Sequence, residues 1–353
     1  MESARIDLLD RKIIQSLQLD PRAPFSRLAT VLGSSEQTIA RRYRRLVEAR
    51  VVRVVAELNS QRISQRDWVV RLRCIPGSAT MVATKVARDP DASWVQVVSG
   101  GTEIFAAVRS RHDNHGTPLL LEQLSLNRQV VDMRAYCLLR EFTSGVSSPL
   151  GSNYLSSSEI DRLSSHHRAP RATDRTAAPL QDSDWPLIRA LGKDGRMTFR
   201  QLADEIHWHE STVRRRVEEL VLEGVLFFNV DLDNPVVGLN APALLWMSVA
   251  PAKLAEVGDA LAGHQQIPFA AATTGSTNMV AKVMCSDETA LYQYLTQELA
   301  SLDGILHVEV TLIMQTVKLY SMTTQMRSRV GTEHSRPHAS TMSTSELLSV
   351  DTP

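Results

Sequence analysis

The apolar residues at the start of the chain recur every three or four positions, which is the spacing of one face of a helix. Residues 7–19 carry such a stripe and predict a helix, which Asp20 and Pro21 end. A second short helix is expected to be capped by Ser26, and Gly33 supplies the turn after it. A short helix followed by a tight turn is typical of a helix-turn-helix domain.

A third helix is predicted from a cap at Ser34 or Ser35 to about Ala49, with its apolar residues on one face and its arginines on the other. Such a helix suits the major groove of DNA, where its first residues reach base edges and its arginines take guanines or phosphates. The alternative is that the arginines only solvate a helix. The predicted DNA-binding residues here are Ser34, Ser35, Gln37, Thr38, Arg41, Arg42, Arg44 and Arg45.

The apolar pattern then alternates between the periods of strands and helices. The order is β-α-β-β-α-β, which is the ferredoxin-like arrangement. The expected strands are residues 68–74, 94–98, 104–108 and 131–139, and the expected helices are residues 81–87 and 119–126.

The whole pattern occurs twice, which indicates an internal duplication. The same register holds through the helical part at an offset of 174 residues and through the later part at an offset of 175. Matched pairs are Asp10 and Asp184, Arg22 and Arg196, Thr38 and Thr212, Arg41 and Arg215, and Gly100 and Gly275. The second set of later elements is expected at residues 244–249, 252–261, 269–273, 279–283, 289–299 and 308–317.

The second helical unit departs from the first. His207 stands at the position of Gly33, and the acidic pair Glu218 and Glu219 replaces Arg44 and Arg45. Acidic side chains repel phosphates, so we expect this unit to bind DNA more weakly or with altered specificity. Its predicted DNA-binding residues are Ser211, Thr212, Arg214, Arg215 and Arg216.

The sequence therefore predicts an α+β fold. It consists of two winged-helix-like helix-turn-helix domains, each followed by a ferredoxin-like βαββαβ sensing domain. The expected boundaries are 1–60 and 61–143 for the first copy, 144–180 for a linker with a short helix near 159–163, 181–235 and 236–320 for the second copy, and 321–353 for a disordered tail.

A glycine-led turn joins the two central strands of each sensing domain. Small residues expose backbone N–H groups, and such a turn can hold a carboxylate-bearing small molecule. It can equally be an ordinary hairpin, which the sequence by itself favours. The candidate effector-binding residues are Gly100, Gly101, Thr102, Glu103, Gly275, Ser276, Thr277 and Asn278.

Composition restricts the function classes. The formal net charge is zero, so DNA binding has to rest on local charge. The three cysteines are far apart and fit a reducing interior, and no signal peptide or membrane span is visible, so we expect a cytoplasmic protein. The pair His207 and His209 lacks partners at a known metal spacing, and no catalytic motif is found. No metal or cofactor is therefore expected.

The residues of the first copy resemble the Lrp/AsnC family of bacterial and archaeal regulators. The resemblance covers both copies, except the linker and the tail. It implies binding to double-stranded DNA, an amino-acid effector, and dimerisation through the sensing domains, so that the two-copy chain looks like a fused dimer that forms homo-oligomers. The matching residues are Leu9 to Ile13, Asp20 to Arg22, Leu28, Ala29, Thr38, Arg41, Arg42 and Leu46.

Two departures and one alternative stay open. The family usually has Asp three residues after the turn glycine, where this chain has Glu103 and Asn278, which puts the usual amino-acid effector in doubt. Sirohaem decarboxylases share the two-part architecture. Such an enzyme would need histidine and arginine side chains in the cleft of the sensing domain. The candidate histidines fall at non-matching positions in the two copies, at His112, His115, His264 and His307.

Overall fold

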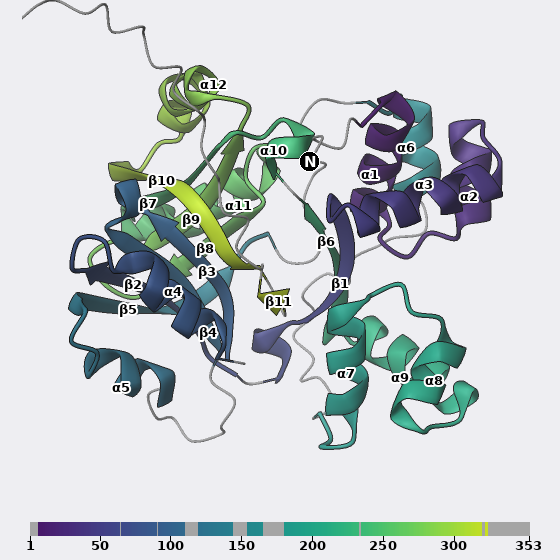
Figure 1. Cartoon of the computed structure of the whole chain (residues 1–353). Helices are drawn as coiled ribbons and strands as arrows, with labels where there is room; N and C mark the ends of the chain where they lie inside the picture. Colours follow the sequence, from purple (N-terminus) through teal and green to yellow (C-terminus); the bar gives the residue numbers. More distant parts are fainter. Residues whose placement is uncertain are drawn as a thin grey trace, which may run out of the picture.

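Two helical heads lie on one side of a closed β-structure, and a two-stranded ribbon runs between them (Figure 1). This computed structural model describes residues 6–63, 65–89, 91–109, 119–143, 154–164, 180–232, 234–319 and 322–323. The first head comes from the start of the chain and the second from its middle, as the duplication predicts.

Each head is a bundle of three helices around one apolar core. The first contains α1 (Leu8–Leu19), α2 (Phe25–Leu32) and α3 (Glu36–Glu48), and the second contains α7 (Asp184–Lys193), α8 (Phe199–Ile206) and α9 (Glu210–Leu222). The expected cap at Ser26 is wrong. The N-cap lies two residues earlier, at Pro24, which makes no side-chain hydrogen bond, and helix α2 begins at Phe25.

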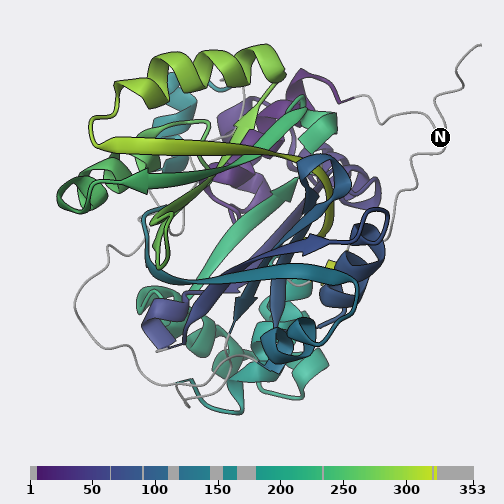
Figure 2. The ribbon, with the colours of Figure 1, turned by 90° about the vertical axis from the view of Figure 1, so that its left-hand side faces the viewer.

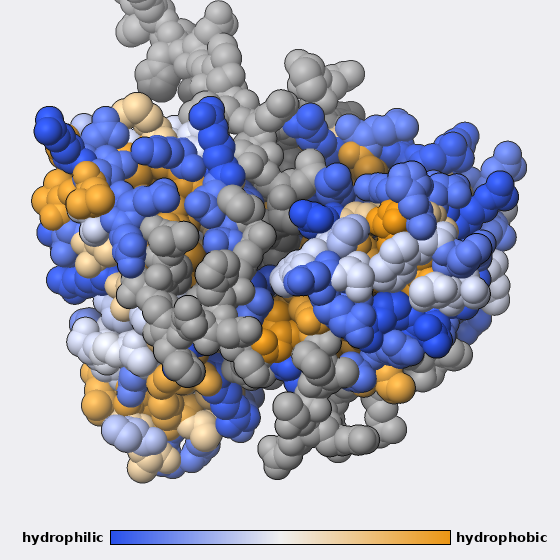
Figure 3. Space-filling model, turned by 90° about the horizontal axis from the view of Figure 1, so that it is seen from below, coloured by the Kyte–Doolittle hydropathy of each residue, from blue (hydrophilic) through white to orange (hydrophobic). Residues whose placement is uncertain are grey.

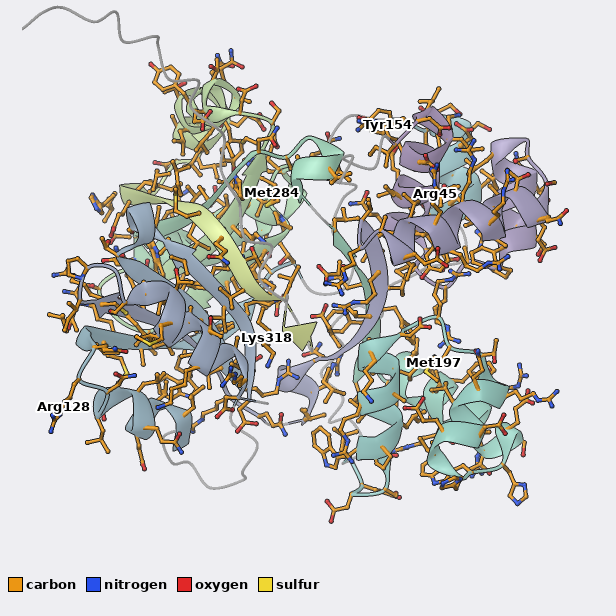
Figure 4. The ribbon with its side chains drawn as sticks, viewed as in Figure 1. Arg45, Arg128, Tyr154, Met197, Met284 and Lys318 are labelled. Carbon is orange, nitrogen blue, oxygen red and sulfur yellow. The ribbon has the colours of Figure 1, made fainter. Side chains whose placement is uncertain are left out.

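Part of the expected linker belongs to the first head. Helix α6 (Ser157–Ser164) packs on α1 and α2, and its Leu163 is fully buried in their core. The hydroxyl of Tyr154 accepts a hydrogen bond from Arg11 at 3.0 Å, beside α1 (Figure 4). This confirms the predicted short helix near residues 159–163 and adds a fourth helix to the bundle.

The ribbon consists of β1 (Val52–Leu58) and β6 (Leu226–Leu232), one strand from each copy. They pair antiparallel, with Val52 opposite Leu232 and Leu58 opposite Leu226. Because Val52 and Leu226 are equivalent in the duplication, the register is symmetric about the pair Val55 and Asn229. The strands next to the helices therefore pair with each other across an internal two-fold relation.

Eight strands close into a ring, here called the barrel. In pairing order they are β10, β3, β4, β2, β5, β8, β9 and β7, which returns to β10. The two copies meet at two equivalent joints, where Leu138 lies opposite Thr273 and Ile313 lies opposite Val98. The bounds are β2 (Asp67–Cys74), β3 (Ala92–Val98), β4 (Glu103–Arg109), β5 (Val130–Glu141), β7 (Ala241–Val249), β8 (Phe269–Thr273), β9 (Met279–Cys285) and β10 (Ile305–Leu319).

Helices cover the outside of the barrel, as the view in Figure 2 shows. Alternate strand residues point to different cores: Val70 and Leu72 pack under the helices, whereas Val69 and Phe105 pack in the interior with Trp246. These helices are α4 (Ala79–Ala87), α5 (Leu119–Ser125), α11 (Leu254–Gly263) and α12 (Glu288–Gln293). Helix α12 continues as helical turns through residues 294–301. The remaining short helical segments are η1 (Ser60–Ile63), η2 (Ser99–Gly101), η3 (Pro251–Lys253) and α10 (Asn234–Val237).

The ferredoxin-like order is confirmed in both copies, with element bounds within three residues of those expected. The expected tail is reached later than residue 321, since Met322–Thr323 form β11 and pair with Lys318 and Leu319. The remainder of the predicted tail, residues 324–353, lies outside the described residues. Among the helices that the structure describes, none is both long and apolar enough to cross a membrane.

Candidate nucleic-acid interface and ligand sites

The turn before each third helix has the geometry of a helix-turn-helix. Gly33 ends α2 with φ +63°, and the Ser35 side chain caps α3 by accepting the Thr38 N–H at 3.2 Å. In the second head His207 adopts nearly the same conformation, with φ +58°, and His209 at the cap makes no side-chain hydrogen bond. The turn is therefore conserved in shape although its residues differ.

The predicted contact face of α3 is only partly free. Gln37, Arg41 and Arg44 are exposed, and Arg44 Nε reaches only the carbonyl of Ala40, at 3.4 Å. Ser34 and Thr38 are half-buried. The structure thus brings Gln37 and two arginines together on the outer surface of the helix.

The two other arginines of α3 hold the head together. Arg42 donates to Asp7 at 2.6 Å and to Asp10 at 3.0 Å, and Arg45 also pairs with Asp10. Asp10 lies fully buried on α1, and the Arg42 hydrogen bond lowers the pKa of Asp7 to about 2. Arg45, which was expected to point away from the apolar face, is 55% exposed, and its guanidinium also pairs with Asp10 of α1 (Figure 4).

The second head repeats this pairing. Arg216 donates to buried Asp184 at 2.7 Å and 2.9 Å, and these residues match Arg42 and Asp10. The same aspartate and arginine occur at equivalent positions in both copies. This repetition in the sequence could have indicated that the pair has a structural role.

The exposed face of α9 carries less net positive charge than that of α3. Arg214 donates to Glu210 at 3.1 Å and lies over Phe199, and Arg215 lies 3.8 Å from Glu219. Helix α3 has four arginines and two glutamates, whereas α9 has three of each. Ser211 and Thr212 are exposed at its start. This supports a second head with less attraction for phosphates.

The heads are joined by two arginines that the repeat matches, although the sequence did not predict their contacts. Arg22 donates to the carbonyl of Met197 at 3.0 Å and stacks on Phe199. Its equivalent, Arg196, donates to the carbonyls of Pro21 and Ala23 at 2.7 and 2.8 Å. Burial lowers the pKa of both guanidiniums. The heads are therefore fixed relative to one another, with Met197 facing the first head (Figure 4).

The first glycine turn is tied into the barrel. Gly100 and Gly101 have φ +66° and +89°, and Glu103 is buried. Glu103 accepts hydrogen bonds from Arg71 Nε at 3.0 Å and from Ser99 Oγ at 2.9 Å, while Arg71 also pairs with Glu309. Thr102 is exposed, and its hydroxyl donates to the Ser99 carbonyl.

The second turn is held in a different way. Asn278 exchanges two hydrogen bonds of 2.8 Å with the backbone of Val249. Gly275 has φ +101°, and a Cβ there would lie 2.6 Å from the ring of Tyr136. The carbonyls of Ser276 and Thr277 accept hydroxyl hydrogen bonds. Glu103 and Asn278 are thus engaged within the protein, and effector binding at these eight turn residues stays a prediction.

A cavity that the sequence did not predict lies between the heads and the barrel. Its volume is about 590 Å³. Its walls come from the ribbon, from α7 of the second head, and from the ends of barrel strands, including Lys318 of β10, which Figure 4 places at this junction. No single stretch of sequence contains these residues, so no local motif could reveal them.

The chain matches two protein-family descriptions. An AsnC-type helix-turn-helix domain matches residues 6–47 and again residues 180–221. An Lrp/AsnC ligand binding domain matches residues 243–323. The matches fall on both heads and on the part of the barrel that the second copy forms.

Relatives are archaeal regulators about as long as one copy. An uncharacterised HTH-type transcriptional regulator of Pyrococcus horikoshii is 33% identical over 140 residues, which are 39% of this chain and 88% of that protein. The regulator FL11 of Pyrococcus furiosus is 30% identical over 148 residues, which are 42% of this chain and 95% of that regulator. Ptr1 of Methanocaldococcus jannaschii is 27% identical over 140 residues, which are 39% and 95%.

A likeness to solved structures extends over the whole tandem. The sirohaem decarboxylase NirDL matches 90% of this chain and 94% of its own, with a TM-score of 0.56 and 16% identity. It has also been solved with an iron-uroporphyrin III analogue. At this identity the likeness shows the fold alone. On the matches to both heads and on its identity with the archaeal regulators, the chain belongs to the Lrp/AsnC family of helix-turn-helix transcriptional regulators, in a tandem two-copy form.

Proposed function

We propose that this regulator binds double-stranded DNA at specific sequences, with α3 as the main reading helix and α9 as the weaker one. The observation that carries the proposal is the exposed group Gln37, Arg41 and Arg44 on a capped helix after a tight turn. Arginines on such a face can contact guanine edges bidentately, and glutamine can contact adenine. The reciprocal contacts of Arg22 and Arg196 hold both helices in one rigid frame.

We also propose that a small molecule modulates this binding and that chains associate through the barrel. The match to a ligand binding domain over residues 243–323 supports the first point. An exposed apolar stripe on the outer face of β10 supports the second, because large apolar side chains on a strand mark association surfaces. The stripe consists of Leu306, Val310, Leu312 and Met314.

The test is selection of bound fragments from random DNA by the purified full chain, at several salt concentrations. We expect a sequence motif in which one half-site is better defined than the other. The affinity should fall with salt in proportion to the phosphates contacted. Recovery of fragments without a motif, bound only at low salt, would contradict the proposal.

A second candidate, a sirohaem decarboxylase-like enzyme, is supported by the whole-chain likeness to NirDL. Among the described residues, no histidine lines the cavity between heads and barrel. His264 is bonded to Tyr294 at 2.9 Å, His307 is exposed on β10, and His112 and His115 lie outside the described residues. Incubation with sirohaem, followed by mass spectrometry for loss of carbon dioxide, separates the candidates, and we expect no turnover.

A further inference from the structure

The cavity lies at the point where the reading and sensing parts of the molecule meet. Ala56, Glu57 and Leu58 of β1 form one wall, with Phe227 of β6 opposite. Helix α7 of the second head adds a second wall, and strands of the barrel close the rest. In the view from the side of the second head, apolar surface is visible at this junction (Figure 3). A volume of about 590 Å³ is within the range of small-molecule sites.

The walls are unusually aromatic for this chain. Three of its five tryptophans, Trp68, Trp94 and Trp185, line the cavity, together with Phe227 and Phe269. Trp94 and Phe269 pack edge to face, with ring centres 4.9 Å apart. Aromatic walls favour a flat apolar body, and ring faces attract a cation. One face of Trp94 already has such a contact, since the Nζ of buried Lys282 lies 5.6 Å from its ring centre.

Carboxyl groups gather at one end of the cavity. Glu57 and Glu141 interact with each other and with Arg109, and Glu141 also faces Asp67. Arg109 is shared, since its Nε donates to Asp67 at 3.4 Å and it reaches the Leu58 carbonyl at 3.5 Å. Three acids thus face one arginine at this end of the cavity.

The two-fold relation of the ribbon shows which cation is missing. In one half, Arg53 pairs with Asp231 at 2.8 Å across the strands. The equivalent pair in the other half is Phe227 and Glu57, which lie opposite each other in the same register. A phenylalanine therefore stands where symmetry would put the arginine that neutralises Glu57.

Polar atoms at the cavity also lack protein partners. Glu57 Oε1, Gln65 Oε1 and Trp68 Nε1 are enclosed and make no hydrogen bond among the described residues. The carboxyl group of Glu57 also forms a hydrogen bond with the side chain of Asn229, on the other strand of the ribbon. Two of the three unpartnered atoms are acceptors, for which an ammonium group supplies hydrogen-bond donors.

The other positive residues that line the cavity either form interactions elsewhere or are exposed to solvent. Lys318 Nζ donates to the Asp89 carbonyl at 2.7 Å. Lys193 is 69% exposed and lies 4.0 Å from Glu205, and Arg189 is exposed on the same helix. Among the described residues that line the cavity, Arg109 is therefore the positive group that faces the three carboxyl groups.

We propose that this cavity is the effector site and that it takes an organic cation, an arylalkylamine whose flat ring lies between the tryptophan walls and whose ammonium group pairs with Glu57. The proposal rests on the proposed regulatory function and names the ligand class and place of that regulation. A ligand there touches α7 and the barrel together, so its binding acts on the position of the second head relative to the sensing part.

Calorimetry on the full chain without DNA tests the site. The probes are two matched pairs: tryptamine against 3-indolepropionate, and 2-(1-naphthyl)ethylamine against 3-(1-naphthyl)propionate. Each pair has similar ring systems and opposite charge. We expect the amines to bind about tenfold or more tightly than the acids, as for a charged hydrogen bond. Equal binding, binding of the acids alone, or no binding would overturn the proposal.

Two variants test where the amine binds. Glu57→Gln keeps the shape but cannot form the carboxylate that pairs with the ammonium group, so it should weaken amine binding about tenfold or more. Phe227→Arg restores the symmetric ion pair, supplies the missing cation from the chain, and should abolish amine binding. Glu256→Gln, on the exposed surface of α11, is the control and should leave it unchanged. Full amine affinity in both cavity variants would overturn the assignment.

The effector role is measured separately. With the selected DNA, a saturating amine should change the affinity about fivefold or more, and the change should vanish in Phe227→Arg. Amine binding without any effect on DNA affinity would overturn the effector role. Amine binding in a chain that selects no DNA motif would instead contradict the proposed function and leave the cavity assignment standing.

Discussion

At the scale of single residues, arginines of the same helix serve two different purposes. Arg42 and Arg216 each hold a buried aspartate and lock the third helix to the first. Removing one partner of such a pair costs about 3–5 kcal/mol, because the other charge is left buried. Only Arg41 and Arg44 of α3 extend into solvent without an acidic partner among the described residues. The number of arginines in a helix therefore overstates the number available to DNA.

Arg41→Ala should weaken binding to the selected DNA by about 1–3 kcal/mol, the value of a bidentate base contact. Arg215→Ala, at the equivalent position, should cost less, because Arg215 already lies near Glu219 and beside Glu218. Arg128→Ala, on the far side of the barrel (Figure 4), is the control. Fluorescence anisotropy at several salt concentrations measures all three. Equal losses for Arg41 and Arg215 would refute the ranking of the heads.

Glu57 predicts a pH dependence of folding. Burial raises its pKa from 4.5 to about 8, Glu141 and Asp231 add to the rise, and Asn229 and Arg109 oppose it. Between these values the folded chain keeps a proton that the unfolded chain has lost. The free energy of unfolding should therefore fall as the pH rises from about 4.5 to 8. Urea unfolding at intervals of pH measures this slope.

Glu57→Gln should make that slope shallower and stabilise the chain at pH 8. Glu141, whose pKa is raised by burial to about 7, contributes a smaller fall that stays in the variant. Lys282, with a pKa lowered by burial to about 8, has the opposite effect, and only above that pH. Identical slopes in the two proteins would show that Glu57 is ionised in the folded state.

At the scale of elements, the second head has a strained turn. His207 adopts the left-handed conformation that Gly33 adopts without strain. His207→Gly should raise the free energy of unfolding by about 1 kcal/mol, and the reciprocal Gly33→His should lower it by a similar amount. Nothing lies within 4 Å of a Cβ at Gly33, so backbone strain accounts for the cost. Thermal unfolding is the measurement, and a loss of stability in His207→Gly would contradict it.

The elements were largely predictable from the sequence because their signals are local. The periods of apolar residues gave the helices and strands of both copies, and the repeat gave the order of domains. The cap of α2 was misplaced because Pro24 fixes the chain without a side-chain bond. The pairing of β1 with β6 was not predicted, since strands 174 residues apart carry no mutual sequence signal. The cavity was missed for the same reason: its walls join at least six elements.

At the scale of the whole molecule, the two copies are interlocked. The ribbon, both joints of the barrel and the exchanged arginines all cross between them. A protease site inserted within residues 165–179 should therefore give two fragments that stay together on gel filtration under native conditions. They should separate only in denaturant. Separation of the cut halves in buffer would show that the covalent connection holds the copies together.

The missing arginine opposite Glu57 has a consequence for evolution. In a dimer of identical chains every substitution appears on both sides, so a symmetric ion pair is either kept twice or lost twice. In this chain one half has the pair Arg53 and Asp231, while the other half has Phe227 opposite Glu57. Duplication within one gene has let the halves diverge in charge, turn residues and reading helix. Such a protein is suited to operators that are not palindromes, which it can approach in only one orientation.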